Sequence, residues 1–152
     1  MTCVIVYRSE QTSLKHLRYR KFWLFVGWAW LVAIWYLSLK AEPPSIYFSV
    51  TFSDKILHAG AYGVLMAWFL QLYHRRHTRI FYAIAFIGMG ILLEYLQRMT
   101  AYRDFEYLDM VADTVGVLLA IVIVRGKLSR VLWQLEQSRI ILRLEQYLAR
   151  HA

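Results

Sequence analysis

Ionisable and amide side chains recur in three otherwise apolar stretches of the chain, at spacings that place them on common helix faces. The pairs are Asp54 with His58, Glu94 with Gln97, and Asp109 with Asp113. Residues three or four positions apart lie on the same face of a helix. Because a carboxylate beside an imidazole can move a proton, His58, Glu94 and Asp113 are candidate catalytic residues for acid/base chemistry.

The same residue types could hold a metal ion, since two or three carboxylates with one histidine suit Zn²⁺, Mn²⁺ or Fe²⁺. No local pattern such as H-E-x-x-H accompanies them. We therefore expect neither a metal nor a cofactor, although the ligand types leave a metal open as an alternative. A nucleophile is not expected, because Cys3 is the one cysteine and Ser53 the one serine beside these pairs.

These pairs belong to a chain that is too apolar for a soluble domain of its length. Hydrophobic residues make up 59% of its 152 residues, and its mean hydropathy is +0.39. Soluble domains are usually about 45–50% apolar. The net charge of +8 does not indicate nucleic-acid binding, because the basic residues flank apolar runs instead of forming one patch. The composition predicts a membrane protein whose partners include membrane lipids and no nucleic acid.

Four apolar segments predict an all-α, polytopic membrane protein with four transmembrane helices. They cover residues 22–39, 56–73, 80–96 and 107–124. Each is near the lower end of the ~17–25 residues that cross ~30 Å of hydrocarbon. We expect an N-terminal cytoplasmic segment over residues 1–21, a membrane domain over 22–124, and a cytoplasmic tail over 125–152 that forms an amphipathic helix.

The basic residues predict that both termini are cytoplasmic. With the N-terminus inside, 14 lysines and arginines flank the inner ends of the spans and four flank the outer ends, as the positive-inside rule requires. The three polar pairs then lie at the outer ends of the second, third and fourth spans. At 1.5 Å per residue, His58, Glu94 and Asp113 fall roughly 6–9 Å below the boundary. This predicts a polar pocket that opens to the outer leaflet.

We expect the side chains at this shared depth to contact one another. An ionisable group left alone in hydrocarbon is costly, so Glu94 and Asp113 should approach the ring of His58. Five glycines are expected at positions of close helix packing: Gly60, Gly63, Gly88, Gly90 and Gly116. Four tryptophans of the first span are expected to anchor it in the membrane: Trp23, Trp28, Trp30 and Trp35.

The polar residues also carry a resemblance to a known family. The stretches DKILHAGAY, EYLQ and RDFEYLDMVADTVG resemble the motifs of the VanZ-like family of small membrane proteins. That pattern is D-K-x-x-H-x-x-x-Y, then E-x-x-Q, then an Arg, an Asp six residues on, an Asn four further and a Gly three beyond. The matching positions are Asp54, Lys55, His58, Tyr62, Glu94, Gln97, Arg103, Asp109, Asp113 and Gly116. Asp113 departs from the pattern, because the family usually has Asn there.

The resemblance implies a multi-pass protein of the bacterial cytoplasmic (inner) membrane that acts in the cell envelope. The family is associated with antibiotic resistance, namely to glycopeptides of the teicoplanin type, which act on lipid-linked cell-wall precursors. The expected ligand is such a lipid-linked precursor or an amphiphilic drug. The residues expected to bind it are Asp54, Lys55, Tyr62, Gln97, Arg103 and Asp109.

Two other functions remain open at this point. The first is an intramembrane enzyme that acts on a lipid-linked substrate. Glu94 or Asp113 would then be its general acid/base, with His58 as proton partner, and Arg103 would hold an anionic group. The second is a proton-coupled carrier, which we favour less because a relay needs acids at both ends and the inner halves of the spans are almost wholly apolar.

The charge distribution gives a first testable prediction. A reporter enzyme that is active only in the cytoplasm should be active when fused after Ala152 or inserted between His74 and Arg79, since both places belong to the basic inner side. A reporter that is active only outside should be silent at the same positions. The reverse result at Ala152 would overturn the predicted orientation.

Overall fold

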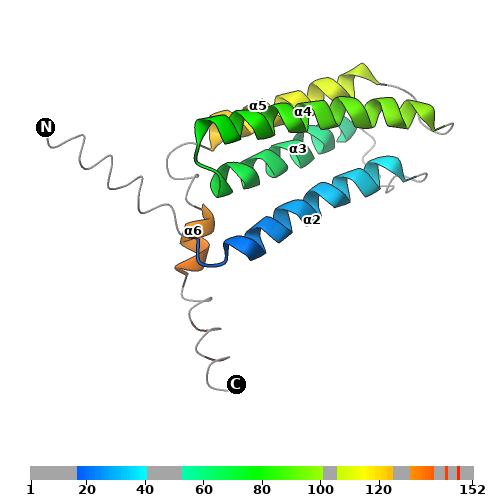
Figure 1. The fold of residues 1–152 in the computed structure, drawn as a ribbon. Coiled ribbons are helices and arrows are strands. Elements are labelled where there is room, and N and C mark those ends of the chain that lie inside the picture. The colour runs from blue at the N-terminus through cyan, green and yellow to red at the C-terminus, as the bar shows by residue number, and fades with distance from the viewer. Residues whose placement is uncertain are drawn as a thin grey trace, which may run out of the picture.

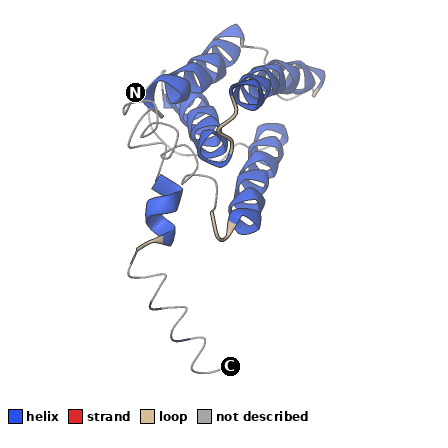
Figure 2. Ribbon diagram, turned by 60° about the vertical axis from the view of Figure 1, so that its left-hand side comes forward, coloured by secondary structure: helices blue, strands red, loops and turns tan. Residues whose placement is uncertain are grey.

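The computed structural model describes residues 17–40, 53–100, 106–124 and 131–138, together with residues 143 and 147. Its helices are α2 (Arg20–Leu39), α3 (Ser53–Leu72), α4 (Arg76–Met99), α5 (Tyr107–Ile123) and α6 (Val131–Glu136) (Figure 1). The described segments are helices joined by loops, with no strand among them (Figure 2). The all-α class is therefore confirmed.

The four long helices occupy the positions of the four predicted spans. The largest difference is in α4, which begins at Arg76 and ends at Met99, where we predicted a span over residues 80–96. Helices α2 and α4 are long and apolar enough to cross a membrane, each with a mean hydropathy of 1.7. Helix α3 begins with charged residues and α5 has only 17 residues; neither meets the same criterion. A crossing by these two helices stays a prediction.

Large apolar side chains cover the outside of the bundle on all four long helices. Phe25 on α2, Val64 on α3, Phe81 on α4 and Val122 on α5 each leave more than half of their surface exposed. Exposed apolar patches of this kind are rare on soluble monomers, and they mark surfaces that contact a membrane or a partner. The exterior is therefore the kind that lipid would cover.

Helices α3 and α5 approach each other backbone to backbone. A Cβ atom at Gly116 would overlap the carbonyl oxygen of Ala59, and one at Gly63 would lie 3.3 Å from the carbonyl oxygen of Gly116. Small residues allow such contacts between membrane helices. The expectation of close packing is wrong for Gly60 and Gly88, where no described atom beyond the local backbone would lie within 4 Å of a Cβ.

A buried apolar core fills the bundle beyond this contact. Phe69 of α3 packs against Tyr82 and Phe86 of α4, with ring centroids 4.7 Å and 5.2 Å apart. Trp28 of α2 meets the same ring at 5.9 Å. The indole of Trp30 also donates a hydrogen bond to the carbonyl of Ala61. Tryptophans of α2 therefore pack on the bundle while their exposed edges remain free to meet lipid.

Helix α6 docks on the start of α2. The buried carboxylate of Glu136 accepts the backbone N–H groups of Arg18 and Tyr19 at 2.8 Å and 3.0 Å, and the indole N–H of Trp23 at 2.7 Å. The backbone N–H of Leu132 donates to the side-chain oxygen of Gln71. These contacts hold α6 against the start of α2 and the end of α3. Most of the predicted amphipathic tail lies outside the described residues.

The contact between α3 and α5 leads to a second prediction. Gly116→Ala should lower the Tm of the detergent-solubilised protein, because the added methyl group collides with backbone and overpacking costs about 1–3 kcal/mol. Gly88→Ala is the matched control, since its methyl group would enter open space. That control should leave the Tm unchanged or slightly raised. Equal Tm values for the two variants would contradict the described contact.

Candidate functional site

The predicted polar residues gather at one end of the bundle, where α3 and α5 begin and α4 ends (Figure 1). Asp54 lies in the first turn of α3 and Asp109 in the first turn of α5. Gln97 lies in the last turn of α4. Antiparallel neighbours therefore bring residues that are far apart in sequence to one depth, as the topology predicted.

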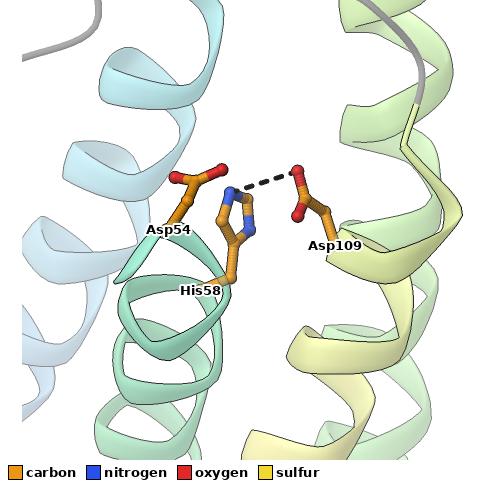
Figure 3. A group of neighbouring side chains, drawn as sticks. All are labelled: Asp54, His58 and Asp109. Carbon is orange, nitrogen blue, oxygen red and sulfur yellow. Dashed lines mark ion pairs between the residues drawn. The ribbon is translucent and has the colours of Figure 1, made fainter. Parts of the chain in front are cut away.

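His58 lies between two carboxylates of α5. Its Nδ1 atom is 3.0 Å from Oδ1 of Asp113, and its Nε2 atom is 3.7 Å from Oδ2 of Asp109. Figure 3 shows the ring of His58 between Asp54 and Asp109, with the ion pair to Asp109 dashed. Both α5 carboxylates are buried. The predicted contact between Asp113 and His58 is present, and the extra carboxylate at 113 has a partner.

Lys55 supplies the positive charge of the cluster. Its ammonium contacts the carboxylates of Glu106 and Asp109, and it lies 3.7 Å from a carboxylate oxygen of Asp54. Asp109 is thus shared, with one oxygen toward Lys55 and the other toward His58. A buried carboxylate is tolerated when it is paired and hydrogen-bonded in this way. We refer to Asp54, Lys55, His58, Asp109 and Asp113 as the polar cluster.

Glu94 and Gln97 are also buried, but their described hydrogen bonds go to the backbone of neighbouring elements. The carboxylate of Glu94 accepts the backbone N–H of Glu106, the residue that precedes α5, at 2.5 Å. The amide of Gln97 donates to the carbonyl of Ser38 near the end of α2 at 2.8 Å. Both residues hold helix ends in place around the cluster. A direct approach of Glu94 to His58 stays a prediction.

Tyr62 contributes a hydroxyl group one turn further along α3 from His58. Its side chain is 2% exposed, and among the described residues its hydroxyl has no hydrogen-bond partner. A buried polar group without a partner usually costs about 1–3 kcal/mol, so such groups are uncommon in folded proteins. The hydroxyl is therefore a buried donor without a described partner, and the expected contact of Tyr62 with a ligand stays a prediction.

Gly90 of α4 makes room for the carboxylate of Asp113. A Cβ atom at position 90 would lie 2.6 Å from Oδ2 of Asp113, which is closer than two such atoms can approach without a shift. The expectation of close packing at Gly90 is confirmed. Its neighbour is the side chain of Asp113 and not a helix backbone, so Gly90 helps to shape the cluster.

Glu106 is a site residue that was not predicted from the sequence. This residue links the polar cluster to Glu94, because its carboxylate contacts Lys55 and its backbone N–H donates to the carboxylate of Glu94. A signal was present, since Glu106 precedes Asp109 by three positions and such spacing predicts a shared face. Arg103, which we expected to hold an anionic group, lies outside the described residues.

Three members of the polar cluster have the donor types of a metal site. Donor atoms of Asp54, His58 and Asp109 all lie within 4.8 Å of one another (Figure 3). Asp113 binds the other ring nitrogen of His58, an arrangement that commonly orients metal-binding histidines. However, the ammonium of Lys55 already lies against Asp54 and Asp109, where a cation would have to bind. The expectation of no metal stays a prediction.

The fold and site define a helical protein with two helices able to cross a membrane and with a cluster of buried charges at one end. Comparison with protein families gives a match to the family described as VanZ/LLP1 over residues 1–132. The chain belongs to this VanZ-like family, and the match includes every residue of the polar cluster. No curated protein and no solved structure matches the chain.

The shared carboxylate of Asp109 generates a third prediction. Lys55→Met should destabilise the detergent-solubilised protein, because removing one partner of a buried ion pair costs up to about 3–5 kcal/mol. Part of that cost will be screened, since Glu106 at the rim is exposed. The double variant Lys55→Met with Asp109→Asn should recover much of the lost Tm. Additive losses in the double variant would show that the two residues are not coupled.

Proposed function

We propose that this VanZ-like protein binds a lipid-linked or amphiphilic ligand of the bacterial envelope at its polar cluster. The observation that carries the proposal is the burial of two paired carboxylates around His58 at one end of a bundle with an apolar exterior. Ionisable residues within membrane helices are expensive, and they usually mark functional sites. Envelope properties and antibiotic susceptibility would change through this binding.

As part of this proposal, the protein lies in the cytoplasmic membrane and all four long helices cross it. Helices α3 and α5 pack against each other and against α4, which is itself a candidate span. Their outer faces expose apolar side chains, among them Val64 on α3 and Leu118 and Val122 on α5. The excess of basic residues at the opposite end favours a cytoplasmic position for that end. The polar cluster would then face the outer leaflet.

The chemistry of the cluster suits a headgroup with both charged and neutral polar groups. Lys55 offers a cation, and the exposed carboxylate of Asp54 offers acceptors. Ile56 and Leu57, beside these residues on α3, expose more than half of their surface. An amphiphile could therefore place its headgroup at the cluster and its hydrocarbon chain along the outside of α3.

The hydrogen bond between Asp113 and His58 favours an intramembrane enzyme as the second candidate. A carboxylate at one ring nitrogen orients an imidazole and stabilises its protonated form, as in other acid/base sites. His58 would then transfer a proton to or from a lipid-linked substrate, with Asp113 as its partner. Glu94 fits this role less well, because its carboxylate binds the backbone at the start of α5.

A fourth prediction tests the site in cells. His58→Ala and Asp113→Ala should each abolish any rise in the teicoplanin concentration that a strain expressing the protein survives, while membrane abundance stays constant. Trp28→Ala should preserve the effect, because Trp28 packs on Phe69 in the core and lies away from the cluster. A polar residue that only joins helices contributes about 0.6 kcal/mol, so its loss would appear in abundance or Tm.

Asp113→Asn separates the two candidate functions. The amide keeps a hydrogen-bonding group of the same size and restores the usual family residue, but it cannot carry the charge that stabilises a protonated imidazole. Full protection by this variant would support ligand binding and exclude proton transfer through Asp113. If membrane abundance falls in step with protection in both alanine variants, the result would contradict the proposal that the polar cluster is a functional site.

A further inference from the structure

A second polar region lies at the opposite end of the bundle from the polar cluster. A cavity of about 370 Å³ opens between the start of α2, the end of α3 and the start of α4. Its lining residues are Leu17, Arg20, Leu72, Tyr73, His74, Arg75 and Thr78. The volume is within the ~300–1,000 Å³ typical of small-molecule sites. None of the lining residues that the structure describes is acidic, and two are arginines, so the described lining is positively charged.

Two of the lining side chains are arginines, and a third arginine supports the wall. The guanidinium of Arg20 lies over the ring of Tyr73, 5.5 Å from its centroid. Arg79 donates hydrogen bonds to the carbonyls of Leu70 and Tyr73 and so fixes the chain that leaves α3. The carboxylate of Glu136 lies near the start of α2, but it already accepts hydrogen bonds from the backbone N–H groups of Arg18 and Tyr19.

The start of α4 adds to the positive character of the cavity. Arg75 is the N-cap residue of α4, no side chain caps this end, and the first turn holds no acidic residue. The first N–H groups of a helix lack partners within the helix, and its dipole favours an anion there. Thr78, in the same turn, also lines the cavity. The lining thus combines two arginines and a threonine with the uncapped start of a helix.

We propose that this cavity binds a phosphate group, carried either by an anionic lipid headgroup or by a soluble phosphate. Arginine forks match phosphate geometry and remain charged at all physiological pH values. Both candidate spans, α2 and α4, begin beside the cavity, so it lies at a membrane boundary, where headgroup phosphates are found. Basic pockets between helices on the cytoplasmic side bind anionic lipids in this way.

His74, an exposed residue of the cavity lining, provides a spectroscopic probe. Partial burial and the nearby charges of Arg79 and Arg20 lower the pKa of His74 below its usual value. A bound phosphate would offset those charges and so raise the pKa of His74 again. This change can be followed by NMR of histidine-labelled protein, with the His74 signal assigned from a His74→Gln variant.

The test uses the full chain in neutral detergent, titrated with dioleoylphosphatidylglycerol and separately with inorganic phosphate. Retention of the lipid is measured by native mass spectrometry, and the pKa of His74 is measured with each probe. Arg20→Gln and Arg75→Gln should each weaken retention about tenfold, as expected for one lost charged hydrogen bond. Arg76→Gln is the matched control, because it removes the same charge from an exposed position that does not line the cavity.

The two probes distinguish the sources of the phosphate. Selective retention of the lipid, with a raised pKa of His74, supports a lipid site; a response to inorganic phosphate alone supports a site for a soluble phosphate. Equal weakening by Arg76→Gln and Arg75→Gln, or no response of His74 to either probe, would overturn the proposal. Because Arg75 is exposed, its variant tests the site without disturbing the core. Failure here would leave the polar cluster at the other end untouched.

Discussion

The close approach of α3 and α5 determines which charges of this protein meet. With Gly116 against the carbonyl of Ala59, the two backbones come near enough for one histidine of α3 to reach two carboxylates on successive turns of α5. A wider spacing would leave those carboxylates in an apolar bundle without partners. Burying an unpaired charge costs far more than helix packing returns, so the small residues and the charged residues depend on one another.

The same constraint explains why α5 is a weak membrane segment on its own. An aspartate at the centre of a membrane helix costs roughly 2.5–3.5 kcal/mol, whereas each Val, Leu or Ile contributes only about 0.3–0.6. Helix α5 has 17 residues and carries both Asp109 and Asp113. Its charges are matched by Lys55 and His58 of α3. The two helices are therefore complementary: α3 supplies the lysine and histidine, and α5 supplies the carboxylates that pair with them.

The bundle has opposite charge character at its two ends. Four carboxylates and one lysine meet where α3 and α5 begin, whereas arginines line the cavity where α2 and α4 begin. The apolar core around Phe69 separates the two ends. Because this core separates them, the two proposed sites would bind their ligands independently. An amphiphile on one side and a phosphate on the other are compatible with one small membrane domain.

The sequence by itself determined the helices and their order, because long apolar runs and three- or four-residue polar spacings are local properties. It also placed His58 and Asp113 at one depth, since antiparallel helices of similar length align their ends. Only the tertiary structure decided which partner each charge takes. Glu94 binds the backbone before α5, and Glu106, which the sequence analysis passed over, joins Lys55. Gly60 and Gly88 face open space for the same reason: helix rotation and side-chain reach depend on contacts between elements, which local spacing does not encode.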